Sequence, residues 1–163
     1  MTDFFEACAM CGPRVLPGED IPALLMTLDR ELALLASQGT YTFKVIPSPG
    51  FNFYAALSVL NLKRIFPEVE LEVLVGDFNN KLRQEDIEIK DFIISHADVV
   101  NEVRLPVRST AVDSLSAALL KNCSYMISFS PTDAGFCAHV REHAVLEGLE
   151  SLYTSRINVG ASF

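Results

Sequence analysis

The sequence has few basic residues and no dense cluster of them. Its 13 lysines and arginines stand against 21 aspartates and glutamates, which gives a formal net charge of -8 and an isoelectric point near 4.8. A chain this acidic repels the phosphate backbone of nucleic acid over most of its surface. We therefore expect no nucleic-acid partner.

Long apolar runs and a basic targeting segment are also missing. No run approaches the roughly 18 apolar residues of a membrane-spanning helix. The first ten residues, MTDFFEACAM, carry acids where a signal peptide carries basic residues. We expect a cytoplasmic protein with no membrane partner.

Glycine and proline are sparse, at eight each, and the 163 residues contain no internal repeat or low-complexity stretch. Half of the residues are hydrophobic, and the mean hydropathy is +0.27. A chain of this length and composition can bury one good core and is short for two. We expect a single domain over residues 1–163.

The four cysteines, Cys8, Cys11, Cys123 and Cys137, lack the regular spacing of a secreted disulfide framework. We expect reduced, mostly buried thiols. Cys8 and Cys11 spell C-x-x-C at the end of a predicted strand, where residues three apart point to opposite faces. Joint zinc or redox chemistry would need a turn between them.

The segment HVREH, from His139 to His143, matches the H-x-x-E-H pattern of some zinc proteases. A metal site needs a third ligand, and only Glu147 and Glu150 follow in the short remaining tail. We expect no metal and no cofactor. No serine lies in a G-x-S-x-G elbow, so nucleophilic catalysis has no support either.

Predicted strands and helices alternate along the chain. Strands are predicted over residues 4–10, 41–48, 69–76, 97–104, 124–130 and 149–159, and helices over 21–39, 52–65, 80–95 and 114–122, with a turn and a helix over 131–148. Helices of this length return the chain to a parallel sheet through right-handed crossovers. We predict an α/β fold, a Rossmann-like three-layer sandwich with a mainly parallel sheet.

Three loops, CGPR, PSPGFN and SPTDAG, follow the first, second and fifth predicted strands. Ligands of such sheets bind beyond the carboxyl ends of the strands, and helix N-termini there attract anions. Gly50 permits close approach of a ligand, and Ser48 and Asn52 can cap the following helix. Ser130 can offer a hydroxyl and Arg14 a positive charge, although Arg14 could equally be a surface residue paired with Glu19 or Asp20.

In order along the chain, CAMCGPRVLPG, SPGFNFYAALSVLNLKRIFPEVELEVL and KDFIISHADVV resemble the SLOG superfamily, in particular its YpsA-like branch of unknown function. The resemblance implies a Rossmann-like fold and a nucleotide or nucleotide-derived ligand. Gly12 and Arg14 match the Gly and Arg of the first motif of that branch. Gly50 matches the glycine before its second helix, and Asn52 stands where it has Asp. Gly135 falls in the place of its Gly-Gly-Thr.

The chain also departs from that pattern. Pro13 replaces a usual His, and Phe136 replaces the Thr of the phosphate cradle. The phosphoribohydrolases of the superfamily carry a catalytic Glu where this chain has Ala138 and His139, which argues against hydrolysis by their mechanism. The resemblance therefore favours a sensor or regulatory module that binds a nucleotide-derived small molecule.

Two other functions stay open. One is a nucleoside-phosphate N-glycosidase, and the other is a pseudo-enzyme that acts through protein interaction. The adjacent aromatics Phe51, Phe53 and Tyr54 cannot all point inward from successive helical positions, so we expect some of them to meet a ligand or the second copy of a homodimer.

Overall fold

Strands and helices alternate in the computed structural model, which describes residues 7–16, 18–76, 82–104, 111–129, 135–146, 148 and 150–153. The strands are β1 (Ala7–Cys11), β2 (Thr42–Val45), β3 (Glu70–Val75), β4 (Val99–Glu102), β5 (Cys123–Ser128) and β6 (Glu150–Tyr153). The helices are α1 (Ile21–Ser37), α2 (Phe51–Leu62), α3 (Gln84–His96), α4 (Ala111–Leu120) and α5 (Gly135–Leu146), and a short 3-10 turn, η1 (Gly18–Asp20), precedes α1.

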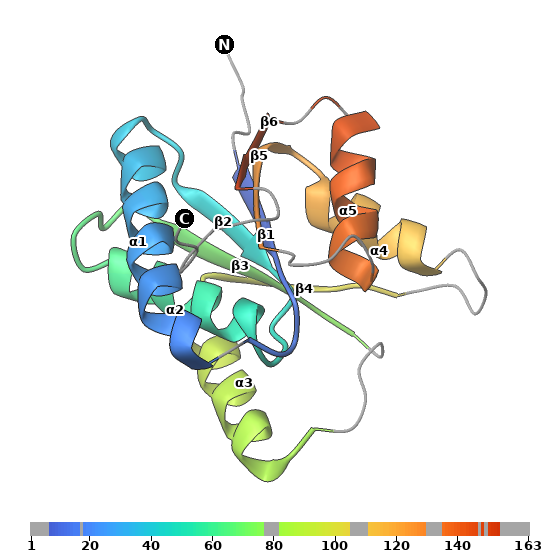
Figure 1. Ribbon diagram of the computed structural model, residues 1–163, viewed down its shortest axis with the longest axis horizontal. Helices are drawn as coiled ribbons and strands as arrows, with labels where there is room; N and C mark the ends of the chain where they lie inside the picture. Colours follow the sequence, from blue (N-terminus) through green and yellow to red (C-terminus); the bar gives the residue numbers. More distant parts are fainter. Residues whose placement is uncertain are drawn as a thin grey trace.

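The six strands form one sheet in the order β4-β3-β2-β1-β5-β6, and each neighbouring pair is parallel. The chain first moves outward from β1 to β4 and then crosses back to place β5 on the other side of β1 (Figure 1). The direction of winding therefore reverses between β1 and β5. The predicted Rossmann-like α/β fold is confirmed.

Two apolar layers hold the helices to the sheet. Helices α1, α2 and α3 pack on one face, where Met10, Phe43 and Leu71 are buried. Helices α4 and α5 pack on the opposite face, where Ala9 and Met126 meet Leu119 and Val140 (Figure 1). The alternation of side chains along each strand assigns successive residues to the two layers.

Helix α2 is buried on several sides because it contacts the sheet and also lies between α1 and α3. Phe51 and Phe53 are both in the core, and Tyr54 is half-buried. Phe51 and Phe53 point inward because a helix enclosed in this way has apolar side chains around most of its circumference. The expectation that some of the three aromatics meet a ligand or a second copy therefore stays a prediction for Tyr54 alone. A homodimer stays a prediction, and the buried Phe51 and Phe53 do not support it.

Several element boundaries differ from those expected. The fourth strand is shorter than the predicted 97–104, and α4 begins at Ala111 rather than near Ser114. Residues 4–6 of the first predicted strand and 154–159 of the last lie outside the described residues. None of the described helices combines the length and the apolar character that a membrane crossing requires.

Candidate functional site

The loops after β1 and β2 are joined by one side chain at the carboxyl edge of the sheet. The Oδ1 atom of Asn52 accepts a hydrogen bond from the backbone N–H of Gly12 at 3.0 Å. Its Nδ2 atom donates to the carbonyl of Ile46 at 2.9 Å and to the Ser48 hydroxyl at 3.2 Å. A side chain that satisfies both loops at once fixes their relative position.

Two glycines allow these loops to approach closely. A Cβ atom on Gly12 would lie 2.3 Å from the Phe51 ring, and one on Gly50 would lie 2.3 Å from the carbonyl oxygen of Arg14. Gly50 also has a φ of 89°, in the region that favours glycine. The two glycines are therefore needed because the loops pack tightly against Phe51 and against the Arg14 backbone. The sequence had suggested instead that Gly50 makes room for a ligand.

The start of α2 differs from the capping arrangement that we expected. Gly50 is the residue before the helix, and no side chain caps it. The Phe51 N–H donates instead to the carbonyl of Pro13 at 2.9 Å, so the loop after β1 covers this helix end. The expectation that Ser48 or Asn52 caps α2 was wrong, because Asn52 is turned toward Gly12 and Ile46.

Arg14 lies next to this junction. Its backbone packs against Gly50, while its side chain is exposed and forms no ion pair with any residue whose side chain the structure describes. The side chain of Asp20, the other expected partner, lies outside that description. Glu19, one of the two partners weighed for it, is likewise exposed and without such a pair. An exposed guanidinium can hold an anion with two parallel hydrogen bonds.

The exit of β5 is tied to the end of β1. The Phe129 N–H donates to the Cys11 carbonyl at 3.2 Å, and the Phe129 ring stacks on Phe51 at 6.4 Å between centroids. Gly135 begins α5, which starts at the same edge of the sheet because it follows a parallel strand. Ser130, another candidate, lies outside the described residues.

The structure thus brings together Gly12, Arg14, Ser48, Gly50 and Asn52. Two backbone donors of this group, the N–H groups of Gly12 and Phe51, are already used within the chain. Two further features lie at this edge of the sheet: the exposed Arg14 side chain and the first turn of α5. The N–H groups of a first helical turn have no partners within the helix and carry partial positive charge.

Cys8 and Cys11 are unsuited to joint chemistry. Cys8 belongs to the core under α1–α3 and Cys11 to the core under α4–α5, so the expected placement on opposite faces is confirmed. Burial raises the pKa of the Cys8 thiol, and it raises that of Cys123 to about 12 even though Lys44 acts to lower it. Within the part of the chain that the structure describes, no cluster of His, Cys, Asp or Glu could hold a metal ion.

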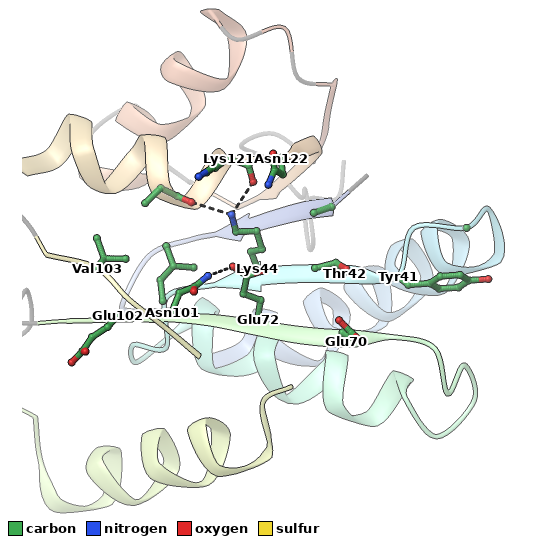
Figure 2. A pocket seen from close by; sticks show the side chains of 14 residues that line it. Tyr41, Thr42, Lys44, Glu70, Glu72, Asn101, Glu102, Val103, Lys121 and Asn122 are labelled. Atoms are coloured by element: carbon green, nitrogen blue, oxygen red, sulfur yellow. Dashed lines mark hydrogen bonds between the residues drawn. The ribbon is translucent and has the colours of Figure 1, made fainter. Parts of the chain in front are cut away.

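Sequence reasoning did not single out a second polar region on the face of the sheet. A hollow of about 890 Å³ there is lined by charged residues that include Lys44, Glu70, Glu72 and Lys121 (Figure 2). In the sequence, Lys44 and Glu72 look like the solvent-facing members of alternating strands. Only the arrangement of helices reveals that Lys44 is buried.

Comparisons with known proteins give a match of fold. No protein-family model matches the chain, and neither does any curated protein. DNA processing protein A (DprA) from Streptococcus pneumoniae superposes on 98% of this chain with a TM-score of 0.54 and 10% sequence identity. The match covers 62% of the DprA chain, so the present chain spans less than two thirds of that protein. The likeness shows a Rossmann-like fold similar to that of DprA. The SLOG resemblance and its YpsA-like branch stay predictions.

Proposed function

We propose that the carboxyl edge of the sheet between β1 and β5 binds a nucleotide or nucleotide-derived small molecule, and that the protein acts as a sensor or regulatory module. The observation that carries the proposal is the reversal of winding between β1 and β5, next to the loop that presents Arg14. In open α/β sheets, ligands bind in the crevice at such a reversal.

The loop that carries Arg14 is held firmly. Asn52 and the Pro13 carbonyl tie it to the start of α2, and Gly50 packs against its backbone. A preorganised loop loses little conformational freedom when a ligand binds, which favours affinity. In this proposal the Arg14 guanidinium binds the phosphate, and the N–H groups of the first turn of α5 also attract it. The Phe51 N–H at the start of α2 takes no part, because it donates to the Pro13 carbonyl.

A thermal-stability panel tests the proposal. Nucleoside monophosphates, inorganic phosphate and free nucleosides are added separately to the whole chain. A nucleotide at 100 times its dissociation constant should add roughly 2.7 kcal/mol to the free energy of unfolding. If no nucleotide raises the melting temperature, the proposal fails, and a protein that acts through protein contacts becomes the better account.

The same samples address catalysis. Release of free base from a nucleoside monophosphate would identify an N-glycosidase. We expect none, because α5 carries Ala138 and His139 where the resemblance would require a catalytic Glu.

A further inference from the structure

One half of a sheet face carries no helix among the described residues. Helices α4 and α5 contact β1, β5 and β6, and α1–α3 lie on the opposite face. The residues of β2, β3 and β4 that point toward the α4 side therefore line an open hollow of about 890 Å³ (Figure 2). None of the carboxyl-edge residues that the proposed function uses lines this hollow, so an inference about the hollow does not rest on that function.

Lys44 extends from β2 into this hollow and is only 5% exposed. Its Nζ atom donates to the carbonyls of Ala118 at 3.0 Å and Lys121 at 2.9 Å, at the end of α4 (Figure 2). An ammonium has three donors, and the third has no acceptor in the described part of the chain. The negative end of the α4 dipole stabilises the Lys44 ammonium at this position. It supplies no acceptor for the third N–H.

Carboxylates occupy the other side of the hollow. Glu72 is aligned with Lys44 in the β2–β3 register and accepts a hydrogen bond from the Asn101 amide (Figure 2). Glu70 lies two residues earlier on the same face of β3. No described carboxylate comes within 4.0 Å of the Lys44 Nζ atom. The hollow is therefore positive beside α4, where Lys121 also lines it, and negative along β3.

We propose that this hollow binds a small zwitterion of the amino-acid class, with its carboxylate on Lys44 and its ammonium between Glu70 and Glu72. A buried charge with an unused donor is stabilised by a ligand of opposite charge. A phosphate dianion would be repelled by the glutamates, and a plain amine would be repelled by Lys44. One molecule that carries both charges satisfies both sides.

Calorimetric titration with a series of amino acids tests this proposal. Glycine, β-alanine, 4-aminobutyrate and 5-aminopentanoate separate the two charges by increasing lengths, and butyrate and butylamine carry one charge each. At equal ionic strength, we expect the best member of the series to bind at least tenfold more tightly than either single-charge probe. If butyrate or butylamine binds as tightly, or if no probe binds, the proposal is overturned.

Variants then locate the site. Glu72→Gln and Lys44→Met should each weaken binding of the best probe at least tenfold, while Glu88→Gln, on the exposed surface of α3, should leave it unchanged. Should Lys44→Met fail to fold, Glu72→Gln decides the matter, since it removes no hydrogen bond to the end of α4. Unchanged binding in Glu72→Gln would contradict the proposal.

Discussion

Asn52 joins two loops that are far apart in the sequence. Its side chain is buried and bonds to Gly12, 40 residues away, as well as to the nearby Ile46. The Gly12 N–H and the Ile46 carbonyl are backbone groups that no β-sheet or helix hydrogen bond satisfies, and the Asn52 side chain pairs with both of them. This amide, together with the Phe51–Pro13 hydrogen bond and the packing of Gly50, positions Arg14 at the carboxyl edge.

Replacing Asn52 with Ala should therefore destabilise the whole protein. The buried Ile46 carbonyl and the half-buried Gly12 N–H would lose their partners, at a combined cost of roughly 2–4 kcal/mol in the free energy of unfolding. Urea unfolding measures the change. Asn61→Ala, on the exposed side of the same helix, is the matched control and should shift stability by no more than about 0.5 kcal/mol. Equal effects of the two substitutions would contradict the role given to Asn52.

Asp98 supports the turn between α3 and β4. Burial acts to raise the pKa of its carboxyl, but the hydrogen bond and charge of Lys63 at 2.7 Å and the Leu71 N–H at 2.8 Å together lower it below its usual value. A carboxyl with a lowered pKa in the folded state stabilises the fold above its unfolded pKa of about 3.9, and this contribution is lost as the pH falls further.

Asp98→Asn should then be less stable than the unsubstituted protein by about 0.5–1.5 kcal/mol at pH 7, because the ion pair is only half-buried. The difference should shrink below about pH 4 as the unsubstituted carboxyl takes up its proton. Chemical unfolding across this pH range, with the exposed Asp91→Asn for comparison, checks the sign. A gap that widens on acidification would refute the assignment.

At the scale of elements, α4 is held to the sheet by a side chain from β2. Lys44 bonds the carbonyls of Ala118 and Lys121, which belong to the group of carbonyls that a helix end leaves without internal partners. Leu115 and Leu119 supply the apolar contacts of the same helix. The polar contact fixes where α4 ends over the sheet.

Lys44→Met keeps most of the apolar length of the side chain and removes the ammonium. We expect a loss of about 1.5–3 kcal/mol in the free energy of unfolding, because two charge-assisted hydrogen bonds disappear. Amide hydrogen exchange should accelerate first in α4. Lys121→Met, at an exposed position beside it, should change neither quantity appreciably, and a stabilised Lys44→Met variant would show that burial of the charge outweighs its hydrogen bonds.

At the scale of the whole molecule, the alternation of apolar strands and amphipathic helices was enough to predict the parallel sheet. It also pointed to the loops after the first, second and fifth strands, and β2, β1 and β5 are indeed neighbours. These features depend on local periodicity and on the handedness of crossovers, which every segment of the sequence carries.

The details of the candidate site could not be predicted in the same way. The sequence predicts that Asn52 caps a helix, yet its Oδ1 atom accepts a hydrogen bond from the Gly12 N–H, and that contact exists only once β1 and β2 pair. The burial of both Phe51 and Phe53 could not be predicted, because it depends on the enclosure of α2 by α1 and α3. That enclosure is a property of the tertiary structure and leaves no local signal in the sequence. Nothing in the sequence indicates that Lys44 is buried, since a lysine in a strand is ordinarily exposed to solvent.

The central claim is that a nucleotide-derived anion binds at the reversal between β1 and β5 and that Arg14 holds it. Calorimetric titration of the tightest nucleotide from the stability panel into the unsubstituted protein, Arg14→Ala and the exposed control Arg64→Ala tests this most directly. We predict that Arg14→Ala loses roughly 1.5–3 kcal/mol of binding free energy with unliganded stability unchanged, and that Arg64→Ala binds normally. Equal affinity in all three proteins would contradict the claim.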